Sequence, residues 1–292
     1  MCDKDSIEDM IEYNVRSRSL SRRQFSGMTL GATLMAALSP VANAAETKES
    51  EVEIKTPDGS ADAYFVHPIT GKHAGVLVWP DIFGLRPAFR QMGKRLAESG
   101  YSVLVVNPFY RAKKAPTSPE HPDFNDPPTR QALMGLMNSL TPTTTKTDAK
   151  AFIGFLDSQD ATDRKRKIGT TGYCMGGPLV FETAAAIVDR VGAGATFHGG
   201  GLVTDKPDSP HLLIPRMKAH FLIAIAENDD QKQPEAKNVL RDSFAKAKLP
   251  AEIEVYKGAL HGWCPPDSQV YNQEQAEKAW NRLLILFKTA LA

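Results

Sequence analysis

Residues 167–178 read KIGTTGYCMGGP, which is the sharpest structural signal in the sequence. A short apolar run at 167–171 leads directly into a glycine-rich turn, and a helical pattern begins at Pro178. Gly172 and Gly176 flank Cys174, where a turn too tight for side chains needs glycine. Proline suits the first turn of a helix, because its missing amide has no partner there. The succession of strand, turn and helix predicts a nucleophile elbow with cysteine in place of serine.

Such an elbow would lift the Cys174 sulfur to the end of a sheet, beside the positive end of the following helix. That position favours thiolate over thiol and stabilises an incoming negative charge. We expect the backbone amide of Met175 to point at a developing oxyanion. The competing interpretation is a buried structural cysteine at the start of a glycine-rich helix.

Short apolar runs alternate with amphipathic stretches along the rest of the chain. This alternation predicts an α/β fold with a mostly parallel central sheet and helices on both faces. Apolar residues at 52–54 and 61–66, around the turn signal Pro57-Asp58-Gly59, predict an N-terminal β-hairpin of two short strands. Further strands are expected at 75–79, 102–106, 167–171, 192–197, 221–226 and 253–256. Helices are expected at 88–99, 129–138, 147–157, 178–188, 234–247 and 272–288.

A cysteine nucleophile needs a base, and the base needs a group that orients it. His261 follows the predicted strand 253–256 and precedes the last helix, whereas His220 stands at the wrong end of its strand and is expected to be structural. The acid is expected after strand 221–226, in Glu227-Asn228-Asp229-Asp230. Asp229 is the preferred carboxylate and Asp230 the alternative. A solvated acidic turn is the competing interpretation.

The N-terminal residues resemble an export signal rather than part of the fold. Ser21-Arg22-Arg23-Gln24-Phe25 is a twin-arginine pattern, and an uncharged stretch leads from it to the small-residue site Ala42-Asn43-Ala44. We therefore expect residues 1–44 to be a twin-arginine signal peptide and residues 45–292 to form one domain. The mature protein is expected in the periplasm or outside the cell, with the export machinery as a partner. Met10 is an alternative start.

Composition excludes several classes of function. Lys and Arg number 35 against 34 Asp and Glu, so no excess charge indicates nucleic acid or an anionic membrane surface. The local cluster Arg164-Lys165-Arg166-Lys167 is expected to be a solvated turn. After Ala44 no apolar stretch is long enough for a membrane anchor. Metal, phosphate-loop and dinucleotide motifs are absent from the sequence, so no metal and no cofactor is predicted.

The elbow, the Asp229 and His261 positions and the segment Trp79-Pro80-Asp81-Ile82-Phe83-Gly84 together resemble the dienelactone hydrolase family. The resemblance spans about residues 51–287 and implies the α/β-hydrolase fold. It also implies that the amide of Ile82 joins that of Met175 in the oxyanion hole. An acid at position 81 would contact the resting thiol and help to deprotonate it. The family usually has glutamate there, and the shorter aspartate weakens that role.

The family's substrate-binding positions are only partly preserved. The resemblance implies an arginine four residues after the catalytic histidine, and this chain has Pro265 there. Tyr110 and Arg111 lie near another arginine position of the family, offset by one, and we expect them to bind substrate together with Trp263. His198 and the glycines 199–201 are expected to border the same opening or to form a plain tight loop. Two long loops, 107–128 and 199–215, are expected to be functional or mobile.

Together these patterns predict an exported hydrolase that cleaves a small ester or lactone, of the carboxymethylenebutenolide type, with a Cys174–His261–Asp229 triad. Other interpretations remain. One is that Cys174 is a redox thiol or pairs with Cys264, and another is that the protein is a broad-specificity exported esterase or acyltransferase. A further one is that the fold is kept only for binding.

Overall fold

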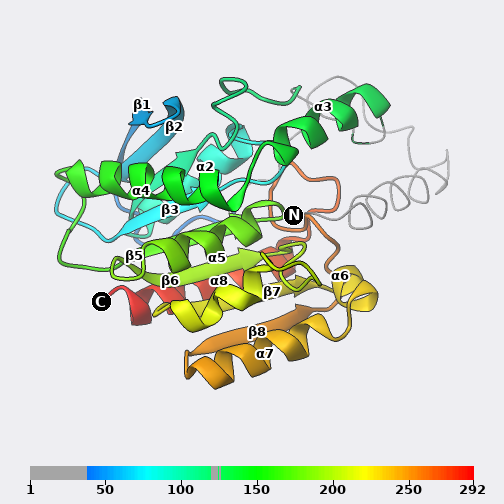
Figure 1. The fold of residues 1–292 in the computed structure, drawn as a ribbon. Helices are drawn as coiled ribbons and strands as arrows, with labels where there is room; N and C mark the ends of the chain where they lie inside the picture. The colour runs from blue at the N-terminus through cyan, green and yellow to red at the C-terminus, as the bar shows by residue number, and fades with distance from the viewer. Residues whose placement is uncertain (1–37, 120–123, 125) are drawn as a thin grey trace, which may run out of the picture.

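The computed structural model describes residues 38–119, 124 and 126–292. The twin-arginine pattern and most of the predicted signal peptide lie outside these residues. The described chain forms one three-layered α/β structure, shown in Figure 1. None of its described helices is long and apolar enough to cross a membrane.

The described strands form one sheet in the order β1-β2-β4-β3-β5-β6-β7-β8. Strands β1 and β2 are antiparallel to each other, β2 is antiparallel to β4, and the remaining pairs are parallel, as predicted. The bounds are β1 Thr47–Thr56, β2 Gly59–Pro68, β3 Gly75–Trp79, β4 Ser102–Val106, β5 Ile168–Tyr173, β6 Val191–Phe197, β7 His220–Ala226 and β8 Ala251–Tyr256.

The chain reverses its direction of travel across the sheet at β3. It moves from β3 outward to β4 and then crosses back to place β5 on the other side of β3. Ligands of open α/β sheets bind at such a reversal, outside the carboxyl ends of the strands. The loop after β3 and the elbow after β5 therefore meet at the position where a binding site is expected.

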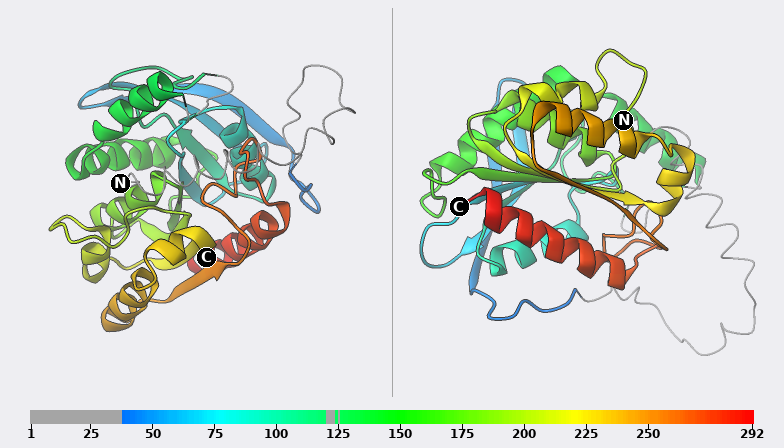
Figure 2. Two further views of the ribbon diagram at one scale, coloured as in Figure 1. Left: turned by 90° about the vertical axis from the view of Figure 1, so that its right-hand side faces the viewer. Right: turned by 90° about the horizontal axis from the view of Figure 1, so that it is seen from below.

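Helices cover both faces of the sheet, as the two views of Figure 2 show. Helices α2 (Pro87–Glu98) and α8 (Gln273–Ala290) cover one face, and α4 (Pro142–Ser158), α5 (Gly176–Ala186) and α7 (Ala236–Ala247) cover the other. Alternate residues of a strand point to opposite faces, so each face has its own apolar core. In β3, Val76 and Val78 enter the first core, while Leu77 and Trp79 enter the second.

Several elements begin or end away from their predicted positions. The hairpin strands have 10 residues each and are not short, because their backbone ladder continues beyond the apolar alternation. Helix α4 begins at Pro142, well before the predicted 147, since Thr141 and Thr144 form a capping box. The predicted loop 199–215 contains a 3-10 helix, Pro210–Arg216. Helix α6, Glu227–Lys232, occupies the predicted acidic loop.

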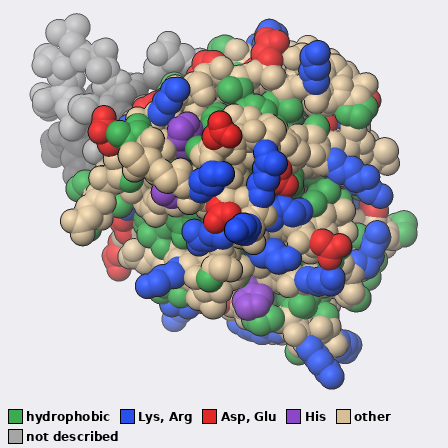
Figure 3. All heavy atoms as spheres, turned by 90° about the vertical axis from the view of Figure 1, so that its left-hand side faces the viewer, with side chains coloured by type: hydrophobic (Ala, Val, Ile, Leu, Met, Phe, Trp, Pro, Cys, Tyr) green, Lys and Arg blue, Asp and Glu red, His purple; other side chains and the backbone are tan. Residues whose placement is uncertain are grey.

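Figure 3 shows the face at the amino ends of the parallel strands, where lysines and arginines are interspersed with acidic side chains. The basic cluster at 164–167 forms an exposed turn before β5, as predicted. Arg166 donates to the carbonyl of Leu291, and Lys167 donates to that of Asp189. The elbow and the other predicted site residues belong to the opposite edge.

Candidate active site

Cys174 occupies a sharp turn between β5 and α5. Its backbone is left-handed, with φ 52°, a conformation that is uncommon for a residue other than glycine. Its amide donates to the carbonyl of Phe197 at 3.0 Å, and its own carbonyl accepts from Gly177 at 3.0 Å. Strained backbone of this kind is concentrated at functional sites. The turn has the geometry expected of a nucleophile elbow.

Two glycines allow the backbone to pack closely around Cys174. A Cβ at Gly172 would lie 2.2 Å from the carbonyl oxygen of Gly176, and a Cβ at Gly176 would lie 2.5 Å from that of Trp79. The second contact brings the elbow against the segment that leads to Ile82. Helix α5 begins at Gly176, earlier than the predicted Pro178, with Met175 as its N-cap. The positive end of the helix is therefore closer to the sulfur than the sequence indicated.

Asp229 and His261 meet at the ends of β7 and β8. The imidazole Nδ1 of His261 lies 2.8 Å from Oδ2 of Asp229, and the histidine side chain is only 2% exposed. The backbone amide of His261 also donates to the side chain of Asn228 at 2.9 Å. Neighbouring Glu227 binds the same loop, since its amide donates to the carbonyl of Ala259 at 2.9 Å. Consecutive residues of α6 thus hold the histidine loop, a role that the sequence analysis did not assign to Glu227 or Asn228.

The pKa of His261 reflects opposing influences. Burial alone would lower it, but the charge of Asp229 and interactions with the Cys174 sulfur outweigh burial and raise this pKa well above its ordinary value. The surroundings of His261 therefore favour the protonated form of its ring.

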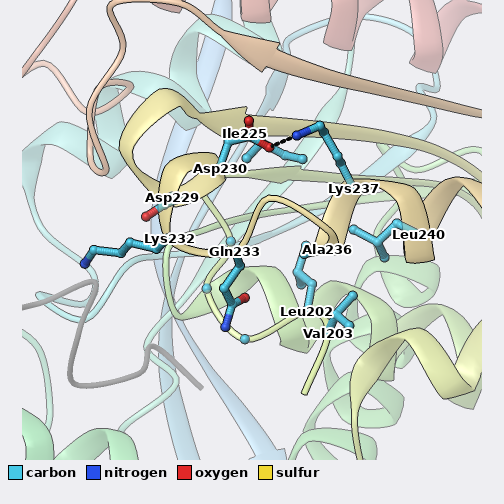
Figure 4. Close-up of a pocket in the computed structure, with 13 residues that line it drawn as sticks. Leu202, Val203, Ile225, Asp229, Asp230, Lys232, Gln233, Ala236, Lys237 and Leu240 are labelled. Carbon is cyan, nitrogen blue, oxygen red and sulfur yellow. Dashed lines mark hydrogen bonds and ion pairs between the residues drawn. The ribbon is translucent and has the colours of Figure 1, made fainter. Parts of the chain in front are cut away.

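Asp230, the alternative acid, has a different partner. One of its oxygens accepts from Lys237 Nζ at 2.6 Å, and Figure 4 shows its side chain turned toward that lysine while Asp229 points elsewhere. Both aspartates line a shallow pocket beside the glycines 199–201. The structure places Asp229, and not Asp230, on the imidazole.

Asp81 is held by Arg86, the N-cap residue of α2. The guanidinium of Arg86 donates to both carboxylate oxygens of Asp81, at 2.6 and 2.9 Å, and also to Asp267, at 2.6 and 3.0 Å. Burial raises the pKa of Asp81, and Arg86 acts against that rise. The bridge connects the segment before Ile82 to the loop after His261. Thiol activation by Asp81 stays a prediction; the structure shows a carboxylate that Arg86 binds through both oxygens.

Ile82 and Met175, the predicted oxyanion residues, lie in one buried apolar cluster with Cys174. The loop after β4 and helix α3 (Pro127–Asn138) supply the other buried members of this cluster: Phe109, Phe124, Leu133 and Met137. We call this set the Cys174 cluster. In Figure 1, α3 lies beyond the carboxyl ends of the strands. Sequence reasoning did not connect α3 with the nucleophile, because the helix lies far from Cys174 along the chain.

Tyr110 and Arg111 are engaged next to the β-hairpin. The hydroxyl of Tyr110 donates to Asp148 at 2.8 Å, and the Arg111 guanidinium forms ion pairs with Asp148 and Asp58 at 2.7 and 2.6 Å. Tyr110 packs in the core that α4 and α5 cover, not in the Cys174 cluster. The structure does not bring these two residues together with Cys174, Asp229 or His261, so their substrate-binding role stays a prediction.

Trp263 is fully buried and packs against Tyr256 and His198. Its ring stacks on Tyr256 at 5.3 Å and meets the ring of His198 edge-on at 5.1 Å. His198 in turn meets His261 at 5.1 Å. Burial, together with the charge of His261, lowers the pKa of His198 well below its ordinary value. These contacts make Trp263 and His198 supports for His261.

Cys264 lies apart from the Cys174 cluster, in the core beside α8 with Tyr173. Cys174 and Cys264 are both buried, and no disulfide joins them. Burial raises the pKa of Cys264 well above its ordinary value, which keeps this thiol protonated.

The sequence model of the dienelactone hydrolase family matches residues 61–291. A Bradyrhizobium protein named "Probable 2-oxo-3-(5-oxofuran-2-ylidene)propanoate lactonase" is 25% identical over 81% of this chain and 92% of its own length. An Escherichia coli protein named "Putative carboxymethylenebutenolidase" is 28% identical over 73% of this chain and 76% of its own. The dienelactone hydrolase structure from Anabaena variabilis shares the fold, with a TM-score of 0.62 at 15% identity over 84% of this chain and 99% of that one.

Proposed function

Because this chain belongs to the dienelactone hydrolase family, we propose that it hydrolyses a small ester or lactone with Cys174 as the nucleophile. The relatives named as a lactonase and as a carboxymethylenebutenolidase support this substrate class. The observation that carries the proposal is the contact between His261 and Asp229 at 2.8 Å, with an imidazole pKa raised by both Asp229 and Cys174. No cofactor or metal takes part in the proposed reaction.

Acylation begins with proton transfer from the Cys174 thiol to Nε2 of His261, whose Nδ1 is held by Asp229. The thiolate attacks the carbonyl carbon and forms a C–S bond, while the carbonyl oxygen takes the negative charge. The amides of Ile82 and Met175 donate to this oxyanion, and such donors are typically worth about 3–4 kcal/mol each. The C–O bond to the leaving group then breaks. The leaving alkoxide takes the proton from the imidazolium, and an acyl-enzyme thioester remains.

Deacylation repeats the sequence with water. His261 takes a proton from the water, and the resulting hydroxide attacks the thioester carbonyl. The C–S bond breaks, the carboxylic acid leaves, and the sulfur regains a proton from His261. For a lactone, the leaving alkoxide stays attached to the acyl group, so the product is a single hydroxy acid.

Replacing the sulfur tests the proposal. Cys174→Ala removes the nucleophile, and we expect turnover of p-nitrophenyl acetate and of simple lactones to fall to the background rate. Cys264→Ala is the matched control, because that cysteine lies in the core beside α8 and should leave turnover near that of the wild type. Ester hydrolysis retained in the Cys174→Ala protein would remove the nucleophile assignment. Circular dichroism of both variants verifies folding.

We further propose that the twin-arginine pattern directs this protein to the periplasm or beyond the cell. The support is the order of Arg22-Arg23, an uncharged stretch and Ala42-Asn43-Ala44. Replacing both arginines by lysine should leave the full-length precursor in the cytoplasm. Fractionation followed by mass spectrometry of the N-terminus measures this. Export of the double-lysine variant would contradict the proposal.

A further inference from the structure

We propose that Cys174 accepts neutral, apolar acyl groups, which contact the Cys174 cluster, and discriminates against acyl groups that carry a carboxylate. This inference rests on the proposed function, since it concerns the acyl group bound to the same sulfur. It assigns the substrate class from the side chains around that sulfur.

The first support is the composition of the Cys174 cluster. Phe109, Leu133 and Met137 are each no more than 2% exposed and pack in the same cluster as Cys174. Leu133 and Met137 lie on the same side of α3, since they stand four residues apart on the helix. Methionine side chains adapt their shape readily, so the cluster can rearrange around chains of different length. Met134 and Leu136 of the same helix pack against it from outside.

The second support is covalent geometry. Once the thioester has formed, the leaving group is gone and only the acyl group remains on the sulfur. Cys174 is itself a member of the cluster and is 7% exposed. An acyl chain attached to that sulfur therefore contacts the side chains packed around it. Each methylene that such contacts bury contributes about 0.8 kcal/mol, or about fourfold in rate.

The third support is that two arginines that could bind a substrate carboxylate already have acidic partners within the protein. Arg86 binds Asp81 and Asp267, and Arg111 binds Asp58 and Asp148. A substrate carboxylate would have to displace one of these acidic partners. A carboxylate brought among apolar side chains without a cation loses its hydration with no compensation.

Matched p-nitrophenyl esters test the inference on the wild-type enzyme. Acetate, butyrate and hexanoate form a neutral series, and the mono-esters of succinate and adipate match butyrate and hexanoate in chain length. We expect kcat/KM to rise about fourfold per methylene in the neutral series. We expect the acidic esters to react about 100-fold or more slowly than their neutral counterparts, because their charge is left uncompensated.

Variants of α3 locate the effect. Leu133→Ala and Met137→Ala should each lower the ratio of hexanoate to acetate turnover about tenfold, because a short acyl group makes few of these contacts. Gln131→Ala is the matched control on an exposed position of the same helix and should keep the wild-type ratio.

The outcomes separate the inference from the proposed function. Cys174-dependent hydrolysis that is insensitive to chain length, or equally fast for the acidic esters, would overturn the inference and keep the hydrolase. Hydrolysis of every ester that persists in Cys174→Ala, or is absent in the wild type, would overturn both. The wild-type series gives its answer even if the α3 variants fail to fold.

Discussion

Two aspartates of this protein have the same place in the fold and different partners. Asp81 follows β3 and Asp229 follows β7, so both stand at the carboxyl edge of the parallel strands. Asp81 is bound by the guanidinium of Arg86, which stays charged throughout the accessible pH range, whereas Asp229 binds the titratable imidazole of His261. The position of both aspartates at this edge allows each carboxylate to bind a side chain from a neighbouring loop. The partner determines whether the carboxylate holds a loop in place or raises the pKa of an imidazole.

The two pairs also differ in what they connect. Arg86 bridges two carboxylates, Asp81 and Asp267, so the loop after β3 and the loop after His261 are held together. Asp229 holds Nδ1 of His261, so the other ring nitrogen is the one that takes part in the proposed reaction. The first pair therefore contributes mainly to stability and the second to the proposed chemistry. Replacing each member in turn tests this distinction.

The largest effect is expected from Asp229→Asn. The amide keeps the shape of the side chain but favours the wrong imidazole tautomer and no longer stabilises the imidazolium. In the serine-protease triad the equivalent change costs about 10⁴-fold in kcat, and we expect a loss of about 10³–10⁴-fold here. Steady-state hydrolysis of p-nitrophenyl acetate measures it. A loss smaller than tenfold would mean that Asp229 does not orient the base.

Arg86→Leu tests the other aspartate. Removing the cation leaves Asp81 buried without compensation, so we expect the free energy of unfolding to fall by about 3–5 kcal/mol. Arg90→Leu, on the same helix, breaks an exposed pair with Glu51 and should cost about 0–1 kcal/mol. Urea denaturation of both variants gives the comparison. Equal losses of unfolding free energy in the two variants would show that the buried bridge stabilises the protein no more than the exposed pair does.

The pH profile should separate the two pairs further. Asp229 raises the pKa of His261, so any stability from their pairing is complete below the ordinary histidine pKa and is lost as pH rises through the raised value. In the proposed mechanism the reactive form pairs a protonated His261 with a Cys174 thiolate, so activity should be lost over the same pH range in which His261 loses its proton. Asp229→Asn should therefore move the alkaline limb of kcat/KM to lower pH. The rate of Cys174 alkylation by iodoacetamide, measured against pH, provides a second readout. An unchanged alkaline limb would contradict the assignment.

The smallest effect is expected from Asp230→Asn. This side chain pairs with Lys237 near the surface and does not reach the imidazole, so its loss should cost about 0–1 kcal/mol in stability and less than twofold in kcat/KM. The same assays as for Asp229 measure it. A large loss of turnover would transfer the acid's role to Asp230 and remove the contrast between the two neighbours.

Much of the fold and of the candidate site was predictable because the signals are local. The apolar runs located β3 to β8, and the glycines around Cys174 predicted a sharp strand-to-helix turn, which its left-handed backbone confirms. Parallel strands bring their carboxyl ends to one edge, so an acid after β7 and a histidine after β8 were expected to be neighbours. Neither prediction needed knowledge of contacts between distant residues.

The tertiary structure alone determines which side chains pair across that edge. It placed Asp229, and not Asp230, on His261, and it brought α3 into the same apolar cluster as Cys174. It also placed Arg86 between Asp81 and Asp267. Asp267 lies 181 positions after the arginine in the sequence. Periodicity along a chain reports which face of an element is buried, but ion pairs and apolar contacts depend on which elements become neighbours. That information appears only when the sheet has been assembled.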